Sequence, residues 1–526
     1  MNNKLLKKVS SFHSMAEVSV ICKRTVLSTK PVQQGEFSSL SPLGLIMEHN
    51  NLRLVFYYDF PKKRSPGELT KELIESISVM LCTYPIVTGR LLRMPDGRWT
   101  VKSNDAGLRL IEAKANGSVD EWLQNVDREN ELKLVYWEEM YHKPYFWSPF
   151  YVQGPKQGLG LPIGWAGPAA HHLHLSYQIE PLAFVLCYMS MLPIVIPIYS
   201  PTLQITEFES GGLAIGLSCT HLLSDPISAT MMIKAWADTT LKGEIISPPL
   251  FHPVPMRKQG SKEDIDNLKH QNFLINYYKS VIDNPAPASH AKQTTISFQF
   301  DHETIQTCIA MAAGNTNSGK DREPNTPFEA LAALFWSRIS KIKGKEKNGL
   351  VGMSICMDIR NVLNLDKGVF GNFMVCNGVG GDGLDENNVY EAAAFIKGAI
   401  SQMNGDEVVD LIEWLGRENY ESPPWMNGSN LICFDLENVE SYFAVYEDSV
   451  RPTHVSYYIE PAVGPGQIVV LPPPRGDGRF YSRVVSVTLP EDEAGKLIED
   501  ALINQLGPTI LMGLNKKHTL MGIGAS

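Results

Sequence analysis

Hydrophobic and polar residues follow patterns in the first half of the chain that predict strands with an amphipathic helix between them. Residues 52–59 form an apolar, β-rich run, and residues 66–85 place apolar side chains at helical spacing. Residues 87–104 predict two strands joined by a Pro-Asp-Gly turn. In residues 209–221, leucine and isoleucine alternate with small residues, which is typical of a strand with one crowded face.

A second region repeats this arrangement later in the chain. Residues 293–301 alternate as a strand, and residues 325–344 predict a helix with an apolar stripe. Thr326 is its expected N-cap, and Glu329 completes a capping box. Further strands are predicted at residues 351–360, 466–471 and 480–489. The chain therefore predicts two mixed α/β domains, separated by a crossover rich in Pro, Lys and Asp at residues 243–291.

Residues 154–204 do not share this pattern, because they are rich in Gly, Pro, His and apolar residues and have no regular charged face. Joining Gln153 directly to Ile205 gives a strand, a short turn and a second strand, so we expect a segment inserted into the first domain. The alternative is a loop that contacts membrane or lipid, since residues 182–199 are uncharged over nearly the ~20 residues that span a bilayer core. Two prolines near the end of that run argue against a spanning helix.

Composition excludes several classes of function. The 526 residues are 44% hydrophobic and 20% charged, as in folded soluble proteins, and the net charge of -10 argues against general affinity for nucleic acid. The eight cysteines include no CxxC pair, so neither a zinc ribbon nor a disulfide framework is predicted, and a reducing intracellular location is expected. His171, His172 and His174 have no acidic or Cys partner at the spacing of a metal site. Residues 1–15 lack the apolar core of a signal peptide.

The main candidate for chemistry is the stretch LSCTHLLSDPISA, residues 217–229, in which His221 and Asp225 follow a predicted buried strand. The free pKa of an imidazole lies near neutrality, so a histidine fixed beside a cavity can take a proton from an alcohol or an amine. The aspartate can hold a neighbouring cation and fix the bend of the chain. Because this spacing often arises by chance, the pair alone does not distinguish a catalytic site from the end of a strand.

Five motifs, taken in order, make the chain similar to the plant BAHD acyltransferases, which carry an HXXXD motif: LCTYPIVTGRLL, HLLSD, PFEALAALFW, VGMSICMDIR and GVFGNF. The resemblance covers nearly the whole chain. It implies two chloramphenicol-acetyltransferase-like domains, residues 16–242 and 292–515, with a channel at their interface that acyl-CoA and acceptor enter from opposite sides. The other expected parts are the leader, the inserted segment, the linker and the tail: residues 1–15, 154–204, 243–291 and 516–526.

The resemblance also implies the roles of individual residues. His221 would deprotonate the acceptor hydroxyl, which attacks the thioester carbonyl of acyl-CoA while nearby donors stabilise the oxyanion. Asp225 would be structural and pair with an arginine. No metal or cofactor is implied, and acyl-CoA is the expected substrate or ligand. The motif residues expected at the channel are Asp358, Arg360, Gly371, Asn372, Tyr446, Asp448 and Arg451.

The chain departs from the family at its second motif, Asp-Phe-Gly-Trp-Gly, where residues 446–450 read YEDSV. In the family the motif aspartate pairs with the arginine that is Arg360 here, so Asp448 or Glu447 would have to replace it. Val450 cannot adopt glycine-only backbone angles, and nothing replaces the tryptophan indole expected near the oxyanion. The residue after the HXXXD aspartate is proline, where most active members have glycine. These departures put catalytic competence in doubt.

The segments THVSYYIEPAVGPGQIVVLPPP, RVVSVTLPEDEAGKL and GSNLICFDLENVESYF resemble the eceriferum-type group of this family. This resemblance implies work with the condensing enzyme of the fatty-acid elongase at the endoplasmic reticulum, where very-long-chain acyl groups grow for cuticular wax. It also implies that His221 is dispensable for that role. We expect a chain that is monomeric by itself and cytoplasmic, in peripheral or indirect contact with the reticulum membrane, with the nucleus as a further location.

Two other interpretations stay open. An active acyl-CoA-dependent O- or N-acyltransferase would use His221 as its general base, and transfer would vanish in His221→Ala. Alternatively, the inserted segment would prevent folding and the chain would have no function, in which case deleting residues 154–204 would raise the soluble yield.

Overall fold

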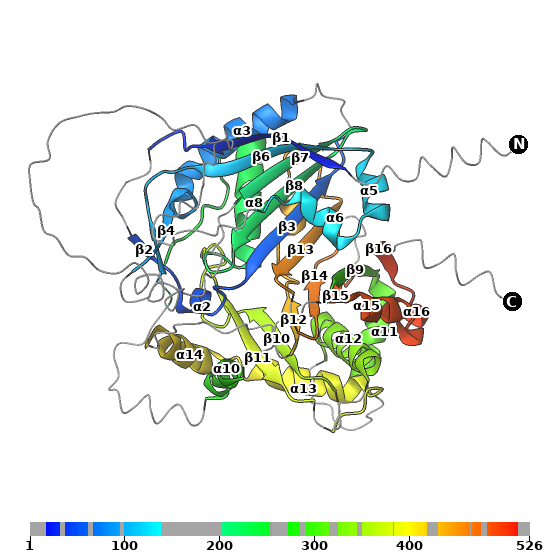
Figure 1. Ribbon diagram of the computed structural model, residues 1–526. Helices are drawn as coiled ribbons and strands as arrows, with labels where there is room; N and C mark the ends of the chain where they lie inside the picture. Colours follow the sequence, from blue (N-terminus) through cyan, green and yellow to red (C-terminus); the bar gives the residue numbers. More distant parts are fainter. Residues whose placement is uncertain are drawn as a thin grey trace, which may run out of the picture.

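The computed structural model describes residues 17–31, 37–60, 67–94, 99–137, 202–252, 254, 272–284, 291–314, 324–344, 350–381, 383–417, 430–462, 464–474 and 481–513. Two large sheets define a first lobe, built on six strands, and a second lobe, built on seven (Figure 1). Helices lie against both sheets, so the fold is mixed helix and sheet, as the sequence predicts.

The sheet of the first lobe has the order β1-β6-β7-β8-β3-β13. Its strands are β1 (Val18–Val26), β3 (Asn51–Tyr58), β6 (Leu108–Ala115), β7 (Thr202–Phe208), β8 (Leu213–Thr220) and β13 (His454–Glu460). All neighbours are antiparallel except β6 and β7. Along β3, Leu54 and Phe56 enter the main core, whereas Val55 and Tyr57 enter a smaller core on the opposite face, as the alternation of a strand requires.

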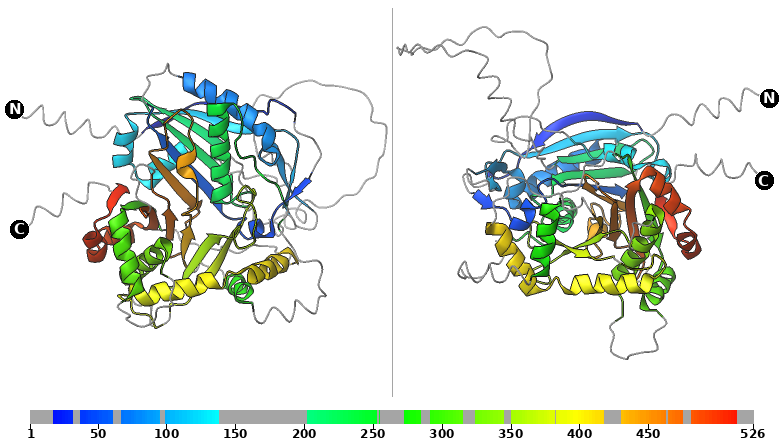
Figure 2. Two further views of the ribbon diagram at one scale, coloured as in Figure 1. Left: turned by 180° about the vertical axis from the view of Figure 1, so that it is seen from behind. Right: turned by 60° about the horizontal axis from the view of Figure 1, so that its bottom comes forward.

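Helices cover both faces of this sheet (Figure 2). α3 (Glu68–Met80) and α8 (Pro226–Lys242) pack on the face of the main core, and α5 (Val119–Asn125) and α6 (Arg128–Glu131) pack on the face of the smaller core. The remaining elements of the lobe are short and include a three-stranded sheet, β2-β5-β4. They are β2 (Phe37–Ser39), β4 (Arg90–Arg93), β5 (Trp99–Lys102), α2 (Pro42–Leu45), η2 (Leu81–Thr83), α4 (Pro85–Thr88) and η3 (Leu132–Leu134).

The sheet of the second lobe has the order β11-β10-β12-β14-β15-β9-β16. Its strands are β9 (Gln293–Phe300), β10 (Met353–Asp358), β11 (Met374–Val379), β12 (Leu431–Asp435), β14 (Gln467–Leu471), β15 (Arg483–Pro490) and β16 (Thr509–Met512). α12 and α13 pack on each other and on this sheet. The helices of the lobe are α10 (Phe273–Asp283), α11 (His302–Ala313), α12 (Pro327–Lys343), α13 (Val389–Ser401), α14 (Gly405–Arg417), α15 (Glu491–Ile498) and α16 (Ala501–Leu506). The short η4 (Ser441–Phe443) lies against α8 of the first lobe.

α12 confirms the local signals found in the sequence. Its N-cap Thr326 accepts from the N–H of Glu329 at 3.1 Å, and the Glu329 carboxylate accepts from the N–H of Thr326 at 2.8 Å. This reciprocal capping box satisfies two donors that the first turn of a helix leaves unpaired. The helix ends at Gly344, as predicted, because its backbone has a positive φ of 79° there.

The two lobes do not correspond to the two halves of the sequence on either side of the expected crossover. β13 lies after residue 292 in sequence but pairs with β3 of the first sheet along its whole length. The reason is packing, because Tyr457 lies edge-on to Phe56 of β3, with ring centres 6.4 Å apart. The expected linker at residues 243–291 is also more than a connection, since it contains α10, which packs on α14 and β11 of the second lobe.

The expected insertion at residues 154–204 ends inside a strand. Thr202, Leu203 and Gln204 form the start of β7 and pair with residues 109–111 of β6, so they belong to the sheet. The rest of that segment lies outside the described residues. So do the leader, the tail, the three neighbouring histidines and the uncharged run at residues 182–199.

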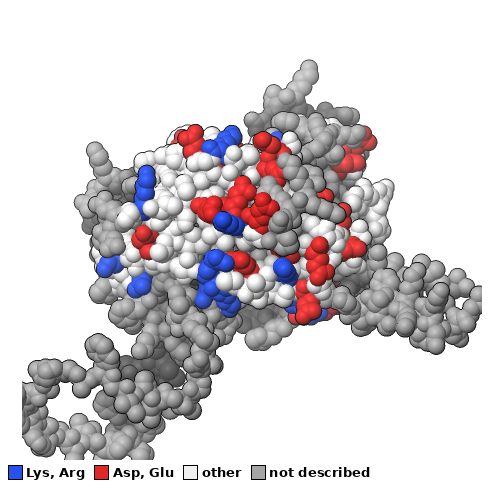
Figure 3. Space-filling view, turned by 90° about the horizontal axis from the view of Figure 1, so that it is seen from above, with Lys and Arg blue, Asp and Glu red and all other residues white. Residues whose placement is uncertain are grey.

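The surface charge and the helices can be compared with two expectations, that the chain does not bind nucleic acid and that its contact with the membrane is peripheral or indirect. Lys, Arg, Asp and Glu intermix on the described part of the face in Figure 3, with no broad basic patch of the kind that binds nucleic acid. Within the described ranges, no helix combines the length and the apolar character needed to cross a membrane.

Candidate functional site

His221 lies at the end of β8, where the chain leaves the first sheet. Its N–H donates to the carbonyl of Asn50 at 2.9 Å, which extends the pairing of β3 and β8 by one step. The following carbonyl, of Leu222, lies so close to Gly44 that a Cβ on Gly44 would be 2.4 Å from it. Backbone contacts therefore fix this turn. The histidine has no exposed surface.

Asn372 of the second lobe contacts both the backbone and the ring of His221. Its Oδ1 accepts from the N–H of Met374 at 3.1 Å, so its Nδ2 faces His221, 2.9 Å from the carbonyl oxygen and 3.1 Å from the ring Nδ1. The Asn372 amide therefore holds both the backbone and the ring of His221 at the contact between the lobes.

The second ring nitrogen of His221 is enclosed by the protein. Nε2 is buried and has no hydrogen-bond partner among the residues that the structure describes. Burial lowers the pKa of His221 to about 4, so the ring is neutral near pH 7. For Nε2 to act as a base, an acceptor substrate would have to reach an atom that solvent does not reach.

Asp225 joins the two lobes. As the N-cap of α8 it accepts from the N–H of Ser228 at 2.7 Å. Its Oδ2 accepts from the N–H of Phe373 at 2.9 Å and lies 2.9 Å from Nη2 of Arg360. The structure thus pairs Asp225 with an arginine, the role that the family resemblance implies.

Arg360 follows β10 and is held on every side of its guanidinium. Nη1 lies 2.7 Å from Oδ1 of Asp358, Nε donates to the carbonyl of Val369 at 2.9 Å, and Nη2 donates to Oγ of Ser228 at 2.9 Å. Burial alone would lower the pKa of Arg360, but Asp225 and Asp358 raise it above its ordinary value. The charge is therefore fixed, and its role is to hold the lobes together.

Gly371 brings the second lobe close to α8. Its N–H donates to Oγ of Ser228 at 3.0 Å, and its carbonyl accepts from the same hydroxyl at 2.8 Å. Its φ is 150°, and a Cβ there would lie 3.2 Å from the Phe373 ring, so glycine is needed at this position. Six of the predicted residues thus form one buried group, the His221 cluster: His221, Asp225, Asp358, Arg360, Gly371 and Asn372.

Tyr446 is not part of this cluster. Its ring lies 5.2 Å from Trp236 of α8 and 5.4 Å from Tyr58, and its hydroxyl donates to the carbonyl of Ile233 at 3.4 Å. Tyr58 ends β3, whereas Asn51, next to the His221 turn, begins it; seven steps along a strand span about 23 Å. The expectation that this stretch borders the reaction centre is therefore not met.

Among the described residues, neither Asp448 nor Arg451 forms an ion pair with a member of the cluster. The ion pairs recorded for Arg360 in the described chain are with Asp225 and Asp358 rather than with Asp448. Arg451 lies 5.9 Å above the Phe443 ring. The loop turns with a positive φ of 67° at Ser449, so it keeps a left-handed residue without glycine. Asp448 therefore does not take the place of the motif aspartate at Arg360.

Sequence reasoning missed Ser228 and Phe373, which connect Asp225, Arg360 and Gly371. Ser228 occupies the third position of α8, where the pattern Asp-Pro-x-Ser already indicates a capped helix. Phe373 lies 4.6 Å from the guanidinium carbon of Arg360, a contact that no local pattern reveals.

Comparison with known proteins places these residues in a family. The model described as "Transferase family" matches residues 16–164 and 186–426, leaving a gap inside the expected insertion. Protein ECERIFERUM 2 of Arabidopsis thaliana is 23% identical over 491 residues, which are 92% of this chain and 96% of that protein. The crystal structure of vinorine synthase matches with a TM-score of 0.59 at 16% identity, covering 94% of this chain and all (100%) of that one.

A second solved structure gives the same fold. F. graminearum TRI101, complexed with coenzyme A and T-2 mycotoxin, matches with a TM-score of 0.57 at 12% identity and covers 90% of this chain and 100% of its own. At these identities the likeness concerns the fold alone, which is the chloramphenicol-acetyltransferase-like fold expected from the sequence.

Proposed function

Because the chain belongs to the Transferase family of BAHD acyltransferases, we propose that it promotes very-long-chain acyl-CoA elongation for cuticular wax, together with a condensing enzyme of the fatty-acid elongase. The similarity to Protein ECERIFERUM 2 over nearly the whole of both chains supports this role. So do the three C-terminal segments that resemble the eceriferum-type group.

The enclosed imidazole is the observation that carries the proposal. His221 is held by Asn372 beside the ion pair of Asp225 and Arg360, yet its Nε2 contacts neither solvent nor a hydrogen-bonding group of the described chain. A general base must reach the proton that it removes. A scaffold whose base is closed off fits a protein that uses its fold to assist another enzyme.

The other parts of the proposal follow from this role. The chain would bind acyl-CoA as a ligand, need no metal or cofactor of its own, and be monomeric without its partner. It would act on the cytoplasmic side of the endoplasmic reticulum through the condensing enzyme.

Co-expression in yeast tests the proposal. A condensing enzyme is expressed alone, with the wild-type chain, or with Asp225→Ala, and the lengths of cellular acyl groups are measured by gas chromatography. The wild-type chain should shift the products to longer acyl groups. Asp225→Ala should not, because it breaks the contact between the lobes. Equal product lengths in the presence and absence of the wild-type chain would refute the role.

A second function is favoured by one observation, the intact pairing of Asp225 with Arg360 behind His221. An active acyl-CoA-dependent O- or N-acyltransferase would use this arrangement. The acceptor would lose its proton to His221 and attack the thioester carbonyl, and the thiol of CoA would leave with the proton. Purified wild-type chain would then release free CoA thiol from acyl-CoA and an alcohol or amine, and His221→Ala would not.

A further inference from the structure

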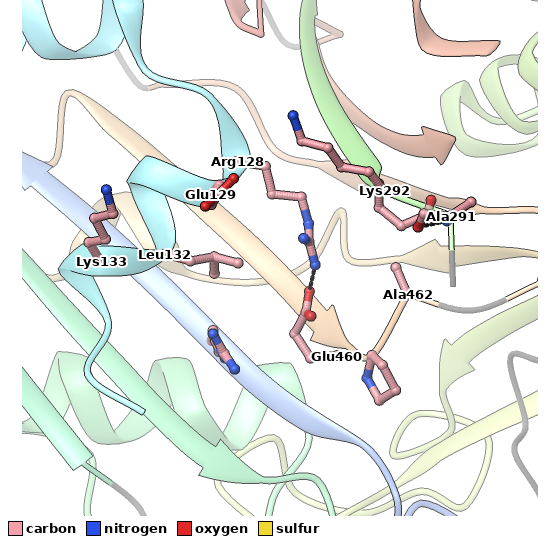
Figure 4. A pocket seen from close by; sticks show the side chains of 11 residues that line it. Arg128, Glu129, Leu132, Lys133, Ala291, Lys292, Glu460 and Ala462 are labelled. Atoms are coloured by element: carbon pink, nitrogen blue, oxygen red, sulfur yellow. Dashed lines mark hydrogen bonds and ion pairs between the residues drawn. The ribbon is translucent and has the colours of Figure 1, made fainter. Parts of the chain in front are cut away.

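A pocket of about 590 Å³ lies between the lobes. Its walls come from β3, α6, η3 and the end of β13 on one side and from the residues that lead into β9 on the other (Figure 4). No member of the His221 cluster lines it. A ligand bound here would contact both lobes without touching the reaction centre.

The pocket is positively charged, although the chain has a net charge of -10. The lining carries four cationic side chains and two carboxylates: Arg53, Arg128, Lys133, Lys292, Glu129 and Glu460. Arg128 and Glu460 pair with each other. Lys292 also lies 3.5 Å from Glu491, but these side chains are 62% and 57% exposed, so that pair is weak. The excess of cations indicates an anionic ligand.

Arg128 is held in place by the protein. Its guanidinium points across the pocket to Glu460 in Figure 4 and lies 5.7 Å from the centre of the Tyr458 ring. Its helix is anchored by the buried carboxyl of Glu131, which accepts from the hydroxyls of Tyr57 at 2.8 Å and Ser456 at 2.7 Å. A cation fixed in this way loses little freedom when a ligand binds.

One buried polar atom on each side of the pocket lacks a hydrogen-bond partner within the described ranges and can serve a ligand. These atoms are Nε of Arg128, a donor from the first lobe, and Oε1 of Gln293, an acceptor from the second. Unpaired buried groups are unfavourable, so both atoms indicate a ligand that accepts at one end and donates at the other. A phosphate next to a hydroxyl group has this combination.

We propose that this pocket binds a phosphate ester with free hydroxyl groups and thereby bridges the lobes. The phosphate pairs with Arg128 and with the amino groups of Lys133 and Lys292, and a hydroxyl donates to Oε1 of Gln293. A phosphate carries up to two charges and three acceptor oxygens, so several cations hold it better than they hold a carboxylate. The volume lies in the range of small-molecule sites. The proposal is independent of the role in acyl elongation.

Binding to the purified full-length chain tests the proposal with two probes of the same chemistry. Ribose 5-phosphate represents a soluble ester and is titrated by calorimetry, with ribose as the control. Vesicles of phosphatidylcholine with phosphatidylglycerol, whose headgroup combines a phosphate with hydroxyls, represent a lipid and are tested by co-sedimentation. Because Arg128 also pairs with Glu460, the variant Lys133→Gln/Lys292→Gln carries the test, and Lys71→Gln/Lys496→Gln is the control for the same loss of charge on exposed helices.

We expect ribose 5-phosphate to bind with a Kd below about 1 mM and the Lys133/Lys292 variant to weaken this binding about tenfold or more. The Lys71/Lys496 control should bind as the wild type does. Co-sedimentation with phosphatidylglycerol vesicles, lost in the Lys133/Lys292 variant alone, would support the site and assign it to a lipid headgroup. Failure of both probes to bind, or equal binding by all forms, would overturn the proposal.

Discussion

Asp225→Ala is the substitution whose cost the structure specifies best. It removes the N-cap of α8, worth about 1 kcal/mol, and the partner of a buried guanidinium, where breaking a pair costs about 3–5 kcal/mol. The N–H of Phe373 also loses its acceptor. Because Asp358 still pairs with Arg360, these terms do not add fully. We expect the free energy of unfolding to fall by about 4 kcal/mol, a large part of the roughly 5–15 kcal/mol that stabilises a domain.

Urea unfolding of the full-length variants, followed by circular dichroism, measures this loss. Asp225→Asn keeps an oxygen for the cap and loses only the charge, so it should cost about 2 kcal/mol, the value of a hydrogen bond to a charged group. Lys71→Gln, on an exposed part of α3, should leave the unfolding midpoint unchanged. The structural role assigned to Asp225 would be refuted if Asp225→Ala unfolded at the same urea concentration as the wild type.

The remaining predictions concern strain, pH and the replaced motif. Gly371→Ala places a side chain on a residue with a φ of 150° and should lower the free energy of unfolding by about 1–3 kcal/mol in the same urea assay. An unchanged unfolding midpoint would contradict the conclusion that this position requires glycine. Burial lowers the pKa values of His221 and His454 to about 4, below the unfolded value of about 6.5. The unfolded state therefore binds more protons between these values, so stability should be complete above pH ~6.5 and fall by about 3 kcal/mol per histidine as the pH drops to ~4. Replacing both residues with Gln should flatten this decline, and an identical pH profile would refute it. Tyr446→Ala should cost about 3–5 kcal/mol through its packing on Trp236, yet leave the NMR titration of His221 unchanged; a shifted titration would mean that the loop does reach the cluster.

Local sequence signals predicted the parts of the fold that depend on local chemistry. The capping box of α12 and the cap of α8 at Asp225 are set by residues three positions apart, so the sequence contains both partners. His221 and Asp225 could be singled out because both follow the apolar run of β8. Their expected roles as base and structural residue came only from the ordered motifs of the family, because an HXXXD spacing by itself is common.

Contacts between distant segments could not be predicted from local patterns. Tyr446 packs on Trp236 because β13 crosses into the first sheet, and no local feature of β13 indicates that crossing. The place of the replaced second motif could not be predicted for the same reason, because position in the family pattern does not give position in space. The inter-lobe pocket likewise combines residues more than 300 positions apart, such as Arg128 and Glu460.

The acyl chain length reached in yeast with His221→Ala tests the central claim most directly. The condensing enzyme is co-expressed with the wild-type chain or with this variant at equal soluble levels, and the cellular acyl groups are compared. If the scaffold rather than the imidazole supports elongation, both forms will lengthen the products equally. If the wild-type chain lengthens the acyl groups and His221→Ala does not, the claim is contradicted, and His221 acts as a catalytic base.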